Sequence, residues 1–176
     1  MHGVVTDGDS LSDLHCQINA NQPPDGGRVD GHGRPMSQLI EDALATRLAQ
    51  WIVSNRAPGL PAEVPVHIAG RDDLRTRPCI VLETADAKLV PALPFTARIN
   101  LSVHLFTQTD DTPVTDHGAW AAALESMLRE TGQMREDLDS PTFVLHDLIA
   151  RETSTVPDET RGRETVLSFE AVVTAG

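Results

Sequence analysis

The alternation of apolar and polar residues is clearest between Ala97 and Leu105. Because successive side chains of a β-strand point to opposite faces, this pattern predicts a strand with one buried face. The stretch from Glu164 to Thr174 alternates in the same way and predicts the last strand of the chain. In the first strand the apolar positions are Ile99, Leu101, Val103 and Leu105, and the polar positions are Arg98, Asn100, Ser102 and His104.

Three other segments have the composition of strands. Val64, Val66 and Ile68 alternate with their neighbours over a short stretch. The continuous apolar run Cys79 to Leu82 follows a proline and fits a strand covered on both faces. Residues Phe143 to Ala150 are also apolar enough for a strand, although two polar residues interrupt the alternation, which is consistent with a bulge or a helical turn.

Two segments have apolar residues at the three- and four-residue spacing of an amphipathic helix. We expect the first to begin after an N-cap at Ser37 and to end near Ser54. We expect the second to be capped by Thr115 or Asp116 and to end near Gly132. The apolar stripes are Ile40, Ala43, Leu44, Leu48, Trp51 and Ile52 in the first helix, and Trp120, Ala123, Leu124, Met127 and Leu128 in the second.

The remaining segments are predicted to be connections. Residues 85–94 read as a loop with two prolines, 107–113 as a polar turn, and 133–141 as a polar linker. Residues 152–163 are long and polar, which makes them a candidate functional or assembly loop. These elements predict an α+β fold in which a mainly antiparallel sheet of about five strands packs against two helices, in the order α-β-β-β-α-β-β.

The first 35 residues differ from the rest because they are rich in glycine and proline and contain only short apolar pieces. Such a segment cannot form a core unaided. We interpret residues 1–35 as an extended N-terminal arm, either disordered in isolation or docked in an oligomer, and residues 36–176 as a single domain. Met36, where the folded pattern begins, is an alternative start site.

Length and composition agree with one globular domain of 176 residues, with 40% hydrophobic and 23% charged residues. No apolar run approaches the roughly 20 residues of a membrane span, and the first residues lack the features of a secretory signal, so we expect synthesis in a cytoplasm. The formal net charge of −12 disfavours tight, nonspecific binding to nucleic acid. Such repulsion is useful where DNA must pass a protein without adhering to it.

One motif suggests an enzyme. The block Gly8 to Asp13 reads like the first block of GDSL serine esterases, in which Ser10 would be the nucleophile. A serine hydroxyl needs an adjacent imidazole as base, supplied in those enzymes by a downstream Asp-x-x-His that this chain lacks. The block also lies in the glycine-rich arm and follows only Val4-Val5, so we interpret it as a chance match and expect no catalytic residues.

Metal and cofactor sites are not expected either. The seven histidines are scattered, without a spacing that places two ligands on one helix face, and we expect most of them to be solvated. His104 is expected to be exposed or hydrogen-bonded, and Cys79 to be a small core residue. A metal site in the arm could in principle be formed by Asp30, His32, His15 and Cys16. We interpret their presence as chance, because polar segments of this kind often contain such residues. No phosphate-binding loop or dinucleotide motif follows a strand.

The charged turns are the remaining candidate sites. Asp72-Asp73 and Asp110-Asp111 are adjacent acids, a spacing that cannot by itself place two carboxylates across a substrate. They are either solvated turns or loops that line a channel or meet basic loops of a neighbouring copy. The candidate contact residues are Arg71, Asp72, Asp73, Arg75, Arg77, Asp110, Asp111, Arg161 and Arg163.

The order of elements resembles that of bacteriophage tail terminator, or tail completion, proteins over about residues 36–174. The resemblance rests on the order itself and on the start Leu-Ile-Glu-Asp-Ala-Leu at 39–44, Pro-Cys-Ile-Val-Leu at 78–82, the strand from Ala97, and Asp-His-Gly-Ala-Trp at 116–120. The glycine-rich arm departs from the usual compact form of that family.

The resemblance implies a structural virion protein without cofactor, assembled in the bacterial host cytoplasm. Proteins of this family form a homo-oligomeric ring, usually a hexamer, on the head-proximal end of the tail tube. The ring stops tube growth, contacts the tail tube protein and the head-tail connector protein, and lets DNA pass without specific binding. Another head-tail neck adaptor is the first alternative, and a small GDSL-like esterase is an alternative of a different class.

Overall fold

The computed structural model describes residues 36–72, 77–93, 95–138, 140–158 and 162–176. Five strands form one sheet with the spatial order β1-β2-β3-β5-β4. The pair β1 and β2 is parallel, and the other three neighbouring pairs are antiparallel. The strands are β1 (Val66–Ile68), β2 (Cys79–Leu89), β3 (Thr96–Gln108), β4 (Phe143–Asp158) and β5 (Gly162–Ala175).

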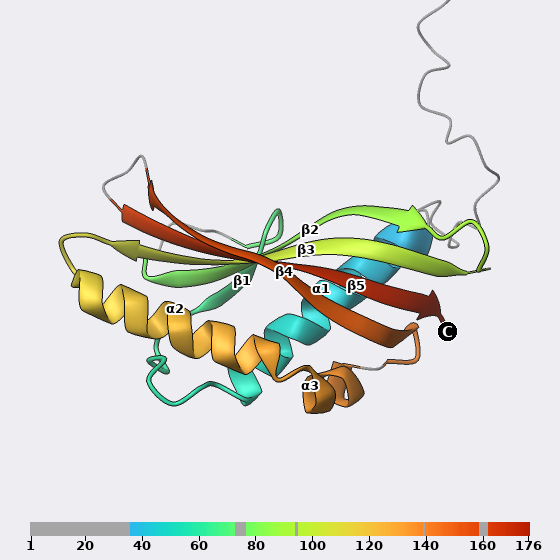
Figure 1. Cartoon of the computed structure of the whole chain (residues 1–176), viewed down its shortest axis with the longest axis horizontal. Helices are drawn as coiled ribbons and strands as arrows, with labels where there is room; N and C mark the ends of the chain where they lie inside the picture. The colour runs from blue at the N-terminus through green and yellow to red at the C-terminus, as the bar shows by residue number, and fades with distance from the viewer. Residues whose placement is uncertain (1–35, 73–76, 94, 139, 159–161) are drawn as a thin grey trace, which may run out of the picture.

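Three helices lie on the same side of this sheet (Figure 1). They are α1 (Met36–Ser54), α2 (Val114–Arg129) and α3 (Thr131–Leu138). The described part of the molecule therefore has two layers, a sheet and a layer of helices. No helix of the described ranges lies on the other side of the sheet, and we call that side the open face.

The central strand β3 shows how the sequence pattern defines the two faces. Its odd-numbered residues from Ala97 to Thr107 are buried towards the helices, whereas Arg98 and Asn100 are exposed and the even-numbered residues from Ser102 to Phe106 are half-buried on the open face. The neighbour β5 is paired with it without a break from Thr96–Thr174 to Gln108–Gly162. The apolar residues of the sequence pattern thus lie on the face towards the helices, and the polar residues lie on the open face.

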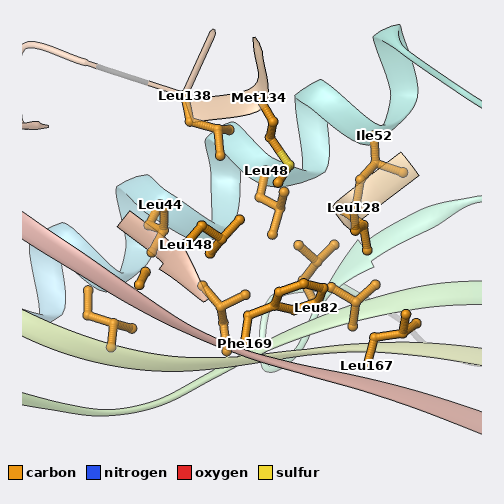
Figure 2. Packing of buried hydrophobic residues seen from close by; sticks show 14 of the residues in the cluster. Leu44, Leu48, Ile52, Leu82, Leu128, Met134, Leu138, Leu148, Leu167 and Phe169 are labelled. Carbon is orange, nitrogen blue, oxygen red and sulfur yellow. The ribbon is translucent and has the colours of Figure 1, made fainter. Parts of the chain in front are cut away.

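The core fills the space between the sheet and the helices (Figure 2). One side of α1 contributes Leu44, Leu48 and Ile52, all at most 1% exposed. Burial of each such side chain contributes about 1.5–3 kcal/mol. The opposing residues come from the sheet and from the two shorter helices and include Leu82, Leu128, Met134, Leu138, Leu148, Leu167 and Phe169.

The α+β class and the packing of helices on a sheet are confirmed, and the predicted order of elements is wrong in one place. Residues 133–141 were expected to be a polar linker, but most of them belong to α3, which follows α2 after the single residue Glu130. Met134 and Leu138 are four residues apart and point into the core, so two apolar residues suffice to dock this short helix. The observed order is α-β-β-β-α-α-β-β.

Two expected loops are largely strand. Residues 85–89 continue β2 after a register shift between Ala85 and Lys88. Residues 152–158 extend β4, and their partners in β5 run from Ser168 to Gly162. The long assembly loop predicted at 152–163 is therefore wrong. Its polar residues lie on an edge strand, where an apolar alternation is not required.

Smaller differences concern pairing and caps. The sheet is not wholly antiparallel, because β1 runs parallel to β2. The first helix begins at Met36, so Ser37 lies inside its first turn. The second helix begins at Val114 after Pro113 and has no side-chain N-cap. The bulge expected near His146 is present, as a register shift between Leu145 and Asp147.

Candidate interaction surfaces

The turn after β1 uses its charged residues within its own chain. The Asp72 Oδ2 atom accepts a hydrogen bond of 2.7 Å from the backbone N–H of Ile68. The Ile68 carbonyl in turn accepts the backbone N–H groups of Arg71 and Asp72. Arg71 forms an ion pair of 2.8 Å with Asp42 of α1 and donates to Thr46. This turn therefore ties α1 to the edge of the sheet.

Arg77 precedes β2 and lies over the open face. Its guanidinium carbon is 5.1 Å from the centre of the Phe106 ring, a cation–π geometry. The Phe106 ring stacks on His104 with centroids 5.8 Å apart. His104 Nδ1 lies 2.5 Å from Glu164 Oε1 and its Nε2 lies 3.6 Å from Glu83. His104 is thus hydrogen-bonded, one of the two states expected for it.

Cys79 is the small core residue that was predicted. It is 2% exposed and is not in a disulfide. Burial raises the pKa of its thiol, and the positive charge of Arg77 opposes that shift. A buried thiol with a raised pKa is a poor nucleophile, because the thiolate is the reactive form. The residue therefore has a packing role.

The acidic pair Asp110 and Asp111 is exposed at the connection from β3 to α2. Arg163 of β5 lies beside this connection, and its guanidinium donates a hydrogen bond of 3.1 Å to the carbonyl of Thr112. Sequence reasoning considered these acids and Arg163 as contacts between copies. The structure brings them together at one end of a single sheet.

A buried histidine lies under the same end of the sheet, and sequence reasoning missed it. His117, in the first turn of α2, is 2% exposed, although most histidines were expected to be solvated. Its Nδ1 lies 2.8 Å from the Thr107 hydroxyl and its Nε2 lies 2.9 Å from the Thr165 hydroxyl. Burial lowers the pKa of this imidazole, and the charge of Arg163 lowers it further. The neutral ring therefore joins α2 to β3 and β5.

Exposed apolar side chains gather at the opposite end of the sheet. Leu89 ends β2, and Leu93 and Phe95 lie in the connection from β2 to β3. The three side chains are 64%, 54% and 56% exposed, and we call them the apolar tip. Val144 at the start of β4 is 43% exposed. Figure 1 shows this connection, the start of β4 and the C-terminus at the same end of the sheet. Sequence reasoning had assigned the connection to an ordinary loop.

The remaining large exposed hydrophobic residues of the described chain do not form a second patch. Val114 and Val156 lie near the charged end, and Val53 lies at the end of α1. Four of the seven large exposed hydrophobics are thus at one end. Because large exposed apolar patches mark interaction surfaces, this end is the strongest candidate for a contact with another protein.

Several predicted site residues lie outside the described residues. They are Asp73, Arg75 and Arg161, together with the whole arm 1–35 and its serine block around Ser10. Within the described ranges, no group of three or more His, Cys, Asp or Glu side chains is arranged to hold a metal ion. None of the three described helices is long and apolar enough to cross a membrane.

No protein-family model and no curated protein matches the chain. Among solved structures the chain is similar to one described as "Virion of native gene transfer agent (GTA) particle", with 17% sequence identity and a TM-score of 0.49. The alignment covers 78% of this chain and 95% of that chain. At this score the likeness carries no argument about function.

Proposed function

We propose that this chain is a structural subunit of a phage-like virion that acts as a tail terminator. Copies of the chain form a ring, in the simplest case a hexamer, on the head-proximal end of the tail tube. The ring stops tube growth and provides the docking surface for the head connector protein. In this proposal the subunit is not an enzyme, holds no cofactor, and is assembled in the cytoplasm of the bacterial host.

The observation that carries this proposal is the chemical difference between the two ends of the sheet. One end presents the apolar tip, whose three side chains are each more than half exposed. The other end presents Asp110, Asp111 and Asp116, all exposed, above an internally bonded histidine. A subunit between a tube and a connector needs two different contact surfaces, and this chain has them.

The pattern resemblance to tail terminators gives independent support. The predicted helix, three strands, helix and two strands are all present in that order, with α3 added after α2. The segments on which the resemblance rests lie in α1, at the start of β2, in β3 and in α2. The proposal therefore does not depend on the similarity to a solved virion chain.

The proposed mechanism is geometric. A heterologous interface repeated around a rotation axis closes a ring, and a closed ring that covers the end of a tube blocks the addition of further tube subunits. Exposed carboxylates such as Asp110 and Asp111 would repel DNA phosphates, because both groups are negatively charged. Contact with them would also release no counterions from the DNA. DNA would therefore pass through the ring without specific binding.

The test is to mix the purified full-length chain with tubes assembled from the tail tube protein of the same virus. We expect native mass spectrometry to detect a ring, and electron microscopy to show it on one end of tubes that no longer elongate. A strictly monomeric protein that ignores the tubes would contradict the proposal. A ring that binds the connector and leaves tube growth unchanged would instead favour a neck adaptor, the first alternative.

The esterase alternative needs a separate measurement, since its serine block lies outside the described residues. We expect the full-length chain and its Ser10→Ala variant to hydrolyse p-nitrophenyl acetate equally slowly, at the rate of a heat-unfolded sample. Hydrolysis that the Ser10→Ala variant loses would contradict the proposed non-enzymatic role.

A further inference from the structure

We propose that residues 14–21 of one copy bind as an added strand along the second half of β4 in a neighbouring copy, and that this contact joins the subunits of the ring. The inference rests on the proposed function and adds to it which two regions of the chain meet. Three features carry it: a strand edge without bonding partners, an apolar side of α2 next to that edge, and one alternating segment of the N-terminal arm.

The edge of β4 is obstructed in its first half. A register shift between Leu145 and Asp147 distorts the strand there, and the carbonyl of His146 accepts a hydrogen bond of 3.2 Å from Arg135 of α3. Bulges at an edge hinder its pairing with a further strand. An added strand is therefore not expected along this half.

The second half of β4 is regular and open. Between residues 152 and 158 it pairs with β5 without a register shift. Pro157 pairs with Arg163 although it has no backbone N–H, so its nitrogen faces away from β5. Because the backbone groups of a strand alternate in direction, the N–H and C=O groups of Thr153 and Thr155 face away from β5 as well. No described residue bonds to these outward groups, and we call residues 153–157 the free edge.

The side chains of the free edge give it no protection by charge. They are Thr, Ser, Thr, Val and Pro, and all are exposed. Natural sheets usually protect an exposed edge with charged residues, bulges or a covering segment, because unpaired backbone groups attract other strands. An edge that lacks charge and bulges over these residues is suited to accept an extended segment.

One side of α2 provides apolar surface next to the free edge. The Thr153 hydroxyl donates a hydrogen bond of 3.1 Å to Glu125 Oε1, which places that side of the helix beside the edge. Figure 1 shows the start of α2 and the end of β4 at the same end of the sheet. Ala122, Ala121 and Gly118 precede Glu125 by three, four and seven residues and so share its side of the helix. Ala122 and Gly118 are exposed.

The arm contains one segment with the pattern of a matching strand. Residues 14–21 alternate apolar and polar side chains without interruption and contain no Asp, Glu, Lys or Arg. The segment lies outside the described residues, and a single strand is not stable without a sheet to pair with. On the free edge its apolar side would cover the small residues of α2, and its polar side would continue the open face. The apolar residues are Leu14, Cys16, Ile18 and Ala20, and the polar residues are His15, Gln17, Asn19 and Asn21.

The attachment of the arm favours a neighbouring copy over its own sheet. The arm joins α1 on the β2 side, where Glu41 accepts a hydrogen bond of 2.9 Å from the backbone N–H of Ala87. Two strands, β3 and β5, separate β2 from β4. The arm therefore leaves on the side away from its own free edge, and residues 22–35 can span up to about 48 Å. Each copy would give one arm and receive one, which is the heterologous contact that closes a ring.

Hydrogen exchange of the full-length protein tests the edge directly. In the monomer the amides of Thr153 and Thr155 are open to solvent, whereas in the ring they would be bonded to the added strand. We expect their exchange to slow by about tenfold or more on assembly. Unchanged exchange at both residues in a formed ring would overturn the proposal.

Two proline variants test the two partners separately. We expect Ile18→Pro in the arm and Thr155→Pro in the free edge each to lower the association constant between copies by about tenfold, because a hydrogen bond at the contact is lost. Thr155→Pro removes an outward N–H and spares the bonds to β5, as Pro157 does. Thr155→Val also loses the hydroxyl contact to Thr165 but keeps the N–H, so it should associate normally.

Thr6→Pro is the control in the arm, since it lies outside the alternating segment and should leave association unchanged. Circular dichroism checks that Thr155→Pro is folded. Ile18→Pro lies outside the described fold, so the test stands even if Thr155→Pro does not fold. Normal association of Ile18→Pro would overturn the role of the arm.

A mixture of the two proline variants tests whether the contact joins different copies. A copy with Thr155→Pro keeps an intact arm, and a copy with Ile18→Pro keeps an intact free edge. We expect native mass spectrometry to detect one-to-one pairs in the mixture and only monomers of each variant alone. Absence of these pairs, with both variants folded, would mean that the arm does not bind the edge of another copy.

Failure of this proposal differs from failure of the proposed function. If the wild-type chain forms rings on tubes and both proline variants form them equally well, the arm is not the contact, while the ring stands. If the wild-type chain stays monomeric both alone and with tubes, the proposed function itself fails.

Discussion

The two ends of the sheet differ in whether the chain itself covers the side chains that lie there. At the charged end the buried His117 is hydrogen-bonded to Thr107 and Thr165, and Arg163 reaches the carbonyl of Thr112. At the other end, the three apolar side chains of the tip stay more than half exposed. One end is completed within the chain, and the other has apolar surface that a partner would bury. The comparison teaches that the two ends offer different chemistry to a partner, exposed apolar area at the tip and exposed carboxylates at the charged end.

The strongest test of this comparison is to disrupt the charged end. We expect His117→Ala to lower the free energy of unfolding by about 2–3 kcal/mol, because it leaves two buried hydroxyl groups short of a partner. Urea denaturation measures the change. His117→Gln, whose amide can bond to both hydroxyls, should lose less. A change below 0.5 kcal/mol for the alanine variant, of the size expected for surface positions, would show that this end is not completed as described.

The pH dependence of stability tests whether the buried His117 is neutral in the folded chain. The pKa of His117 is lowered below its ordinary value of 6.5 by burial and by Arg163, so the folded chain binds this proton less readily than the unfolded chain. The neutral ring therefore contributes stability above pH 6.5 that is lost as the pH falls from 6.5 through the lower folded pKa.

We expect the free energy of unfolding to fall between pH 7 and pH 5, and His117→Gln to reduce that fall. Urea titrations at successive pH values measure it. His104→Gln is the matched control, since it removes a half-buried histidine of the open face and leaves His117 in place. If the free energy of unfolding depends on pH identically in the wild type and in His117→Gln, the lowered pKa of His117 does not contribute to stability.

At the tip we expect a smaller effect on stability. Phe95→Gly should be more stable than Phe95→Ala by about 1 kcal/mol, because only the alanine keeps the cost of the left-handed conformation. Thermal unfolding of the two variants measures the difference. Equal melting temperatures would show that the backbone at Phe95 is not strained.

The smallest expected effect concerns Leu89 and Leu93. Their replacement by serine should change the free energy of unfolding by less than about 0.5 kcal/mol, because exposed side chains contribute little to the folded monomer. Leu128→Ser, at a position that is 1% exposed, is the matched core control and should be strongly destabilising. A large loss of stability at Leu93 would mean that the tip packs within its own chain.

The strands β3 and β5 could be predicted from the sequence, because each has one face against the apolar core and the other on the open face. In β3 the odd-numbered residues from Ala97 to Thr107 are buried, and in β5 the odd-numbered residues from Thr165 to Val173 are buried, so the alternation covers most of each strand. The second half of β4 could not be read in this way. Its residues from Arg151 to Pro157 are all exposed on an edge strand, so no burial imposes a pattern on them.

The candidate site was less predictable than the fold. Leu89 and Leu93 were read as parts of the loop 85–94, and Phe95 follows that loop. Only the folded chain shows that the three side chains are exposed at the same end. His117 looked like any polar residue near a helix start, since a sequence does not show which hydroxyl groups will surround it. The positive φ at Phe95 leaves no trace in the residue type.

The turn after β1 limits how copies of this protein can associate through the edges of their sheets. Ile68, whose backbone groups point away from β2, has both of them satisfied by the adjoining turn, through the Asp72 carboxylate and two backbone N–H groups. A strand only three residues long then has too few outward groups left to pair with a foreign strand. The sheet can be extended at the β4 side alone. In the part of the chain that the structure describes, strand addition at this single edge would join two copies edge to edge and leave no second edge for a third.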